Sequence, residues 1–216
     1  TQLNGPLDNY AGTHLLTTID RANEEKVAFL VIEIDTPGGR IDILRELVQK
    51  ILGSSVPIIS YVSPMGASAT SAGTYILLAS HIAAMAPTTN VGSATPVLMD
   101  GTEPSPDMRN KIVNDAAAYI RGIAIERNRN ANWAERSVRS ADNVTASEAV
   151  DMEIIDFVAQ DIPELLERSS NRIVTINGIQ TELDFANSDL VQQDESFNVN
   201  YAVIWIVTGA ILILVE

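Results

Sequence analysis

The sequence predicts an α/β protein built around a parallel sheet, and three features of its first half carry this prediction. Residues 27–34 and 57–62 are short, almost wholly apolar runs, which is typical of strands buried on both faces. Residues 41–52, between them, repeat their apolar side chains at helical spacing. A strand, a helix and a strand in this order form a βαβ unit, whose two strands run parallel.

The remaining elements follow from local signals along the chain. Residues 9–25 form an amphipathic pattern, and Ser105-Pro106-Asp107 is a strong helix start, with a capping serine followed by proline in the first turn. Asn177-Gly178 predicts the turn of a small hairpin. The other expected elements are helices at 74–80, 106–127, 132–139, 146–150 and 162–168, strands at 82–85, 154–159 and 173–176, and a loop at 87–92.

We expect three regions along the chain. Residues 1–170 form the main domain, 171–200 a small hairpin and polar linker, and 201–216 the start of a transmembrane segment. Residues 201–215 carry no charge, but at about 1.5 Å per residue they cover only about 22 Å of a hydrocarbon core of about 30 Å. The expectation is therefore a piece of a longer product; the alternative is a buried terminal helix or strand.

Composition excludes several classes of function. The chain of 216 residues has 28 acidic and 14 basic residues and a formal net charge of −14, which disfavours a nucleic-acid partner. It has no cysteine, so thiol catalysis, disulfides and thiolate metal sites are excluded. No metal site and no phosphate-binding loop is indicated, and we expect no cofactor.

Two loops follow strands at the edge where parallel α/β sheets place their active sites. In the first, Asp35 to Gly39, adjacent glycines can bring backbone N–H groups close to an oxyanion. In the second, Gly66 to Gly73, Ser71 stands just before a predicted helix among small neighbours. The N–H groups of Gly39 and Ala72 are candidates for the two donors of an oxyanion hole. The alternatives are an ordinary turn and a helix-capping serine.

Ser71 needs a base before its hydroxyl can attack a carbonyl. The chain has only two histidines. His81 lies ten residues further on, at the far end of the predicted helix and about 15 Å away. His14 lies on a polar helix face. Neither is a good candidate, so a lysine is the remaining type of base.

The chain has three lysines. Lys26 precedes a strand, at the wrong edge of the sheet, and Lys50 lies on the outer flank of a helix. Lys111 falls beside the apolar face of the helix at 106–127, in line with small residues that a long side chain could cross. The competing interpretation is an exposed pair with Asp115, four residues later.

Together these motifs resemble the NfeD family of membrane-bound serine proteases, within the Clp protease/crotonase fold superfamily. The resemblance covers about residues 5 to 170 and consists of an ordered series of motifs. The motifs are Asp35-Thr36-Pro37-Gly38-Gly39, the run from Gly66 to Ile76, Ala84-Met85-Ala86-Pro87, Asn110-Lys111, Arg121 to Arg127, Trp133-Ala134-Glu135, Thr145 to Ala149 and Ile155-Asp156.

The resemblance implies a spiral of repeated ββα/βαβ units and a membrane-anchored endopeptidase with a Ser–Lys dyad. The dyad falls on Ser71 and Lys111 and the oxyanion hole on Gly39 and Ala72. Clp proteases use a Ser-His-Asp triad, but residues 91–97 contain no histidine here. The family also implies an extracytoplasmic protease domain, apolar peptide substrates, a stomatin-like membrane partner and self-association into a homo-oligomer.

The sequence departs from the family pattern at Thr70, where a small apolar residue is usual, so a branched side chain next to the nucleophile could crowd the site. Two alternatives stay open. A crotonase-like acyl-CoA enzyme would use Gly39 and Ala72 but leave Ser71 and Lys111 without a role. A catalytically inactive pseudoprotease scaffold would keep the fold and the membrane anchor.

Overall fold

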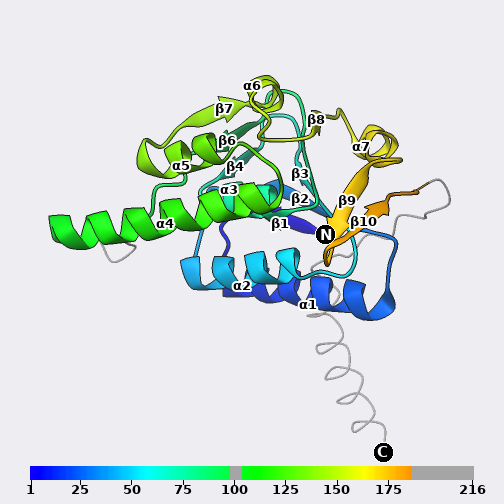
Figure 1. The fold of residues 1–216 in the computed structure, drawn as a ribbon, viewed down its shortest axis with the longest axis horizontal. Helices are drawn as coiled ribbons and strands as arrows, with labels where there is room; N and C mark the ends of the chain where they lie inside the picture. Colours follow the sequence, from blue (N-terminus) through cyan, green and yellow to red (C-terminus); the bar gives the residue numbers. More distant parts are fainter. Residues whose placement is uncertain (98–103, 186–216) are drawn as a thin grey trace, which may run out of the picture.

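The computed structural model describes residues 1–97 and 104–185 (Figure 1). The expected linker beyond residue 185 and the apolar segment at 201–216 lie outside the described residues. Within the described part of the chain, no helix combines the length and apolar character needed to cross a membrane.

The centre of the fold is a sheet of five strands that all pair in parallel, as predicted. A second sheet of three strands lies beside it, with one parallel and one antiparallel pairing. In spatial order the large sheet consists of β1 (Gln2–Asn4), β2 (Leu30–Asp35), β3 (Ile58–Val62), β5 (Ile82–Met85) and β8 (Phe157–Val158). The small sheet consists of β4 (Ser68–Thr70), β6 (Asn90–Gly92) and β7 (Asn143–Thr145).

A strand-strand-helix unit occurs twice in succession. The first unit is β3, β4 and α3 (Ala72–Ala79), and the second is β5, β6 and α4 (Pro106–Glu126). In each unit the first strand joins the large sheet and the second strand joins the small sheet. This repetition brings the start of α3 to the place where the two sheets meet.

Alternating side chains of the central strands divide the core into two layers, because successive residues of a strand point to opposite faces. Ile58 and Val62 belong to the larger apolar cluster, which includes residues of the helices α1 to α5. Ile59 and Tyr61 belong to the smaller cluster on the opposite face. The helices not yet bounded are α1 (Asn9–Glu25), α2 (Ile41–Leu52), α5 (Ala131–Arg139), α6 (Ala146–Asp151) and α7 (Ile162–Ser169).

The expected hairpin is present and packs on the sheet. β9 (Ile173–Ile176) pairs antiparallel with β10 (Ile179–Glu182) across a turn in which Asn177 and Gly178 have φ values of 50° and 79°. Positive φ at both central residues is the turn that suits a twisted hairpin. The rings of Phe29 and Phe185 lie 4.3 Å apart, so the chain after residue 170 shares the smaller core.

Most element predictions are confirmed, and the errors are in short strands. The bounds of α1, α2 and β5 agree with the sequence prediction, and Ser105 caps α4 as expected. The predicted loop at 87–92 is wrong, since it contains β6, and β1, β4 and β7 were not predicted. Each of these strands has only three residues, too few to show an alternating pattern. Helix α3 begins at Ala72, two residues earlier than predicted.

Candidate active site

Ser71 occupies the junction between β4 and α3 in a strained conformation. Its φ is 52° and its ψ −113°, a combination that residues with a side chain rarely adopt. Surrounding hydrogen bonds hold it there: the Ser71 N–H donates to the carbonyl of Gly92 at 3.1 Å, and the Thr74 N–H donates to the carbonyl of Ser71 at 3.0 Å. The backbone therefore fixes where the Ser71 side chain starts.

The hydroxyl of Ser71 is not used for capping. Its side chain makes no capping hydrogen bond with the first turn of α3, although Ser71 is the residue that precedes the helix. The hydroxyl that organises this turn is that of buried Thr74, which lies 2.9 Å from the carbonyl of Ala69 and 3.0 Å from that of Gly92. The capping interpretation of Ser71 is therefore wrong.

The glycine loop lies directly against Ser71. Gly38 has a φ of 119°, and a Cβ added to it would stand 2.6 Å from Ser71 Cβ and 2.9 Å from Ser71 Oγ. Gly39 is equally confined on the other side, where a Cβ would stand 2.2 Å from the carbonyl oxygen of Leu7. Only glycine fits at either position, so the Pro-Gly-Gly sequence is required by this close approach.

The two predicted oxyanion donors lie on the segments that meet at Ser71. Neither the N–H of Gly39 nor that of Ala72 has a hydrogen-bond partner among the residues with described positions. Ala72 opens α3, where the helix dipole places partial positive charge. The Ala72 nitrogen is 3.5 Å from the Cβ position of Gly38. Two open backbone donors beside a serine hydroxyl are what an oxyanion hole requires.

Two further residues position the glycine loop and Ser71, and neither was proposed as a site residue from the sequence. Thr36 is fully buried; its N–H donates to the carbonyl of Ser68 at 2.8 Å, and its side-chain oxygen accepts from the N–H of Gly38 at 3.1 Å. Gly92 has a φ of 136° and no room for a Cβ, since one would stand 2.1 Å from the carbonyl oxygen of Asp142. The isolated glycine in the loop at 87–92 was the signal for the second residue.

Lys111 has no contact with Ser71 in the structure. Its side chain is exposed, and no hydrogen bond or ion pair joins it to another residue in the described ranges. It lies near the beginning of α4, whose first turns project beyond the rest of the described fold in Figure 1. The alternative pair with Asp115 is also absent, because the Asp115 carboxylate binds Arg45 of α2. The dyad stays a prediction.

The two histidines have different surroundings in the structure. His81 is 7% exposed at the far end of α3, and its Nδ1 accepts a hydrogen bond from the N–H of Ile58 at 3.1 Å. Burial, helped by the nearby guanidinium groups of Arg127 and Arg129, lowers the pKa of His81 to about 3. His81 is thus held by the core rather than facing Ser71. His14 lies beside Thr1, with Nε2 2.9 Å from the threonine hydroxyl.

Thr70, the departure from the family pattern, lies in strand β4. Its N–H donates to the carbonyl of Thr36 at 3.0 Å, and the strand pairs it with Gly92. A branched side chain is favoured in a strand, so the residue suits its backbone. It therefore contributes to the same strand junction that positions Ser71.

Comparison with known proteins places these features in a family. The sequence pattern of the family described as NfeD1b, N-terminal domain, matches residues 6–193. The chain is 39% identical over 199 residues to the membrane-bound protease PH1510 of Pyrococcus horikoshii. That alignment covers 91% of this chain and 45% of the relative, so the chain spans less than half of that protein's length.

Solved structures agree with the sequence comparison. A mutant of the 1510-N membrane-bound stomatin-specific protease with a lysine replaced by alanine, in complex with a substrate peptide, matches with a TM-score of 0.82 and 36% identity, covering 93% of this chain and 94% of the other. A mutant of the same protease with a serine replaced by alanine matches with a TM-score of 0.81 and 38% identity, covering 89% of this chain and 96% of the other. The 1510-N membrane protease specific for a stomatin homolog from Pyrococcus horikoshii matches with a TM-score of 0.76 and 35% identity, covering 94% of this chain and 96% of the other.

Proposed function

The chain belongs to the NfeD1b family, and we propose that it is a serine protease domain with Ser71 as the nucleophile and Lys111 as the general base. The observation that carries this proposal is the strained Ser71, whose hydroxyl caps nothing and lies against a glycine loop with open backbone donors. Similar solved proteases with a serine or a lysine replaced by alanine support a pair of these two residue types. The repeated strand-strand-helix units support a Clp/crotonase type of spiral.

The proposed mechanism uses groups of this chain alone. Unprotonated Lys111 accepts the proton of the Ser71 hydroxyl while Oγ attacks the carbonyl carbon of a peptide bond. The N–H groups of Gly39 and Ala72 stabilise the resulting oxyanion. Protonated Lys111 then gives its proton to the leaving amine, and a water molecule, activated by the same lysine, releases the acyl group from Ser71.

We infer that Lys111 reaches Ser71 when the exposed beginning of α4 is covered, either by a bound peptide or by a second copy of the chain. Covering this region would remove the lysine side chain from water, which favours its unprotonated form. The single chain leaves it exposed. This inference includes the expected homo-oligomer as one way to assemble the dyad.

The proposed substrate is an apolar peptide segment. Ile41 follows the glycine loop after one residue and is 51% exposed, and Met65, immediately before the second loop, is 65% exposed. Exposed apolar side chains beside both loops would contact apolar residues on either side of the scissile bond. Because similar proteases are described as specific for a stomatin or a stomatin homolog, we propose a stomatin-like membrane protein as the source of this segment.

We also propose attachment to a membrane through the apolar segment at 201–216, with the protease domain on the extracytoplasmic side. The support is the description of the relative as membrane-bound and the uncharged run from residue 201 to residue 215. The described residues themselves contain no span.

Hydrolysis of an apolar peptide library tests the dyad. Ser71→Ala and Lys111→Ala should each lower kcat/KM by about 10³-fold or more, because each removes a group that acts in the transition state. Arg109→Ala is the matched control: it removes an exposed cation two residues before Lys111 on the same helix and should keep the wild-type rate. Wild-type activity in Lys111→Ala would show that the base is wrong.

One observation favours the pseudoprotease scaffold as a second candidate, namely the exposed Lys111 without a contact to Ser71. A scaffold would bind apolar peptides without cutting them. Labelling with a fluorophosphonate separates the two, since an activated Ser71 reacts with the reagent and an idle serine does not. Peptide binding with neither labelling nor cleavage would favour the scaffold.

A further inference from the structure

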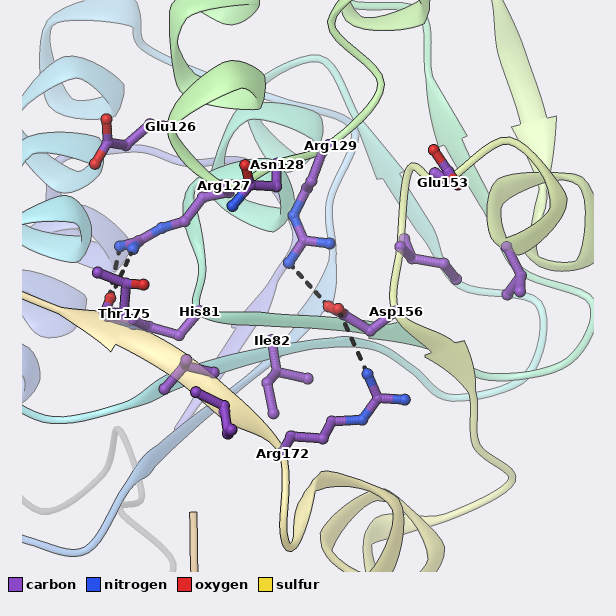
Figure 2. A pocket seen from close by; sticks show the side chains of 14 residues that line it. His81, Ile82, Glu126, Arg127, Asn128, Arg129, Glu153, Asp156, Arg172 and Thr175 are labelled. Atoms are coloured by element: carbon purple, nitrogen blue, oxygen red, sulfur yellow. Dashed lines mark hydrogen bonds and ion pairs between the residues drawn. The ribbon is translucent and has the colours of Figure 1, made fainter. Parts of the chain in front are cut away.

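A cavity lies at the opposite end of α3 from Ser71. It has a volume of about 510 Å³ and lies where β5 begins, next to the end of α4 and the start of β9. Figure 2 shows the guanidinium groups of Arg127, Arg129 and Arg172 around it, with His81 and Asp156 between them. The proposed protease mechanism uses none of these side chains.

Two hydrogen-bond donors face each other on one wall of the cavity. His81 Nδ1 accepts from the N–H of Ile58, so the neutral ring carries its proton on Nε2. That Nε2 lies 3.4 Å from Nη2 of Arg127, which can only donate. Neither group satisfies the other, and an acceptor atom in front of the pair would satisfy both. Burial and the neighbouring charge of Arg129 lower the pKa of Arg127 despite the opposing effect of Glu126, and burial likewise lowers the pKa of His81.

Backbone carbonyls hold the side chains of Arg127 and Arg129 in place. Arg127 donates from Nε to the carbonyl of Ala79 at 2.7 Å and from Nη1 to that of Thr175 at 3.3 Å. The side chain of Arg129 is 5% exposed; it donates to Asp156 at 2.9 Å and to the carbonyl of Ser80 at 3.3 Å. Its Nε is buried with no hydrogen-bond partner in the described structure. The donors of the cavity wall are therefore preorganised.

The acidic side chains at the cavity do not neutralise these donors. Asp156 is shared between Arg129, at 2.9 Å, and Arg172, at 3.8 Å. Glu126 and Glu153 also line the cavity, but both are exposed, and Figure 2 shows them directed away from the guanidinium groups. Two guanidinium groups thus share one inward carboxylate, and that of Arg127 forms no ion pair in the described chain, which leaves positive charge on the inner surface of a strongly acidic protein.

We propose that this cavity binds a small oxyanion, a phosphate or a carboxylate group, which accepts hydrogen bonds from His81 Nε2 and Arg127. A guanidinium group offers a fork of parallel donors that suits both kinds of oxyanion. Arg172 adds charge at another part of the wall. The site is separate from the proposed protease site and does not depend on it.

Nuclear magnetic resonance of the histidine rings tests the proposal directly. In a His14→Gln background His81 is the single histidine, so its ring nitrogens are assigned without ambiguity. Titration with inorganic phosphate, and separately with acetate, at pH 7 should move the Nε2 resonance of His81 in a saturable way. A response to phosphate alone or to acetate alone identifies which oxyanion the site takes. If neither anion moves this resonance, the proposal is wrong.

Calorimetric titration of arginine variants provides the second measurement. Arg172→Gln should weaken the binding of the active anion by about tenfold, because it removes one positive charge from the cavity wall. Arg168→Gln is the matched control, because Arg168 and Arg172 stack on the same Phe157 ring at 4.9 and 4.6 Å but only Arg172 lines the cavity. Arg168→Gln should bind as the wild type does. If both variants weakened binding equally, general surface charge would explain the effect, and the assignment of the anion to this cavity would be overturned.

Discussion

The two ends of helix α3 are built in opposite ways. All eight residues of the helix are buried, so both ends lie inside the protein. At its beginning the N–H of Ala72 has no partner in the described chain, and the neighbouring residue Gly38 has no side chain to cover it. At its end the carbonyls of Ala79 and Ser80 accept hydrogen bonds from Arg127 and Arg129. We call the beginning of α3, at Ala72, the open end, because its N–H donor stays available for a reacting oxyanion. We call the other end, at Ala79 and Ser80, the closed end, because cations cover its partial negative charge.

Of the variants that compare the two ends of α3, Gly38→Ala is expected to have the largest effect on activity, because it changes the surroundings of Ser71 at the open end. The new methyl group would stand 2.6 Å from Ser71 Cβ, and the backbone would keep a φ of 119° that alanine rarely adopts. Displacing Ser71 by even about 1 Å costs about 100-fold in rate, so we expect kcat/KM for peptide hydrolysis to fall at least that far.

Gly66→Ala is the matched control for this prediction. Gly66 also has a positive φ, of 87°, in the neighbouring loop, but a Cβ there meets nothing within 4 Å. It should therefore show the backbone strain of about 1–2 kcal/mol without the contact to Ser71. If Gly66→Ala lost as much activity as Gly38→Ala, the strain alone would explain the loss and the close packing on Ser71 would have no special role.

The open end of α3 could be found from the sequence, and the reason is local. The two loops that carry Gly38, Gly39 and Ser71 each come after a predicted strand, and the ends of adjacent parallel strands meet at one edge of a sheet. The small residues around Ser71 indicated that other parts of the chain come close to it. The strain at Ser71 was not predictable, since it depends on the carbonyl of Gly92, a residue of a strand that was assigned to a loop.

The closed end could not be found in this way. His81 was considered only as a base for Ser71 and was excluded, and no spacing in the sequence connects it with Arg127 or Arg172. These residues come from the end of α3, the end of α4 and the start of β9, which only the tertiary fold brings together. Lys111 is the intermediate case: the helix that carries it was predicted, whereas the structure leaves its side chain exposed.

Asp156→Asn should weaken the closed end without changing its shape. Arg129 would keep its buried position but lose the carboxylate 2.9 Å away, and an unpaired buried charge is costly. Because Asp156 is 26% exposed, we expect a loss of about 3 kcal/mol in the free energy of unfolding, at the low end of the range for such pairs. Urea unfolding at pH 7 measures it.

The control for this loss is Glu25→Gln, which removes a carboxylate from the exposed Arg21–Glu25 pair. An exposed pair four residues apart contributes only about 0.5 kcal/mol. If Asp156→Asn lowered the free energy of unfolding by as little, Arg129 would not depend on this carboxylate. The charge of Arg129 at the cavity would then have to be balanced by another group.

The smallest of the three effects is a loss of stability in mild acid that comes from His81. Its pKa is about 3 in the folded chain, against 6.5 for an ordinary histidine, so between these values the unfolded chain binds a proton that the folded chain does not. Stability from this group is therefore present above about pH 6.5 and lost as the pH falls towards 3. Between pH 7 and pH 5 the loss amounts to about 2 kcal/mol.

Urea unfolding of His14→Gln and of His14→Gln/His81→Gln, in buffers free of phosphate and carboxylate, isolates this contribution, since the acidic residues affect both variants alike. The first variant should lose about 2 kcal/mol more between pH 7 and pH 5 than the second. The same measurement in phosphate buffer should show a smaller loss, because an anion bound beside His81 would favour the protonated ring. Identical pH dependence of the two variants would mean that His81 binds its proton equally well in the folded and unfolded chain, which would contradict the buried neutral ring whose Nδ1 accepts from Ile58.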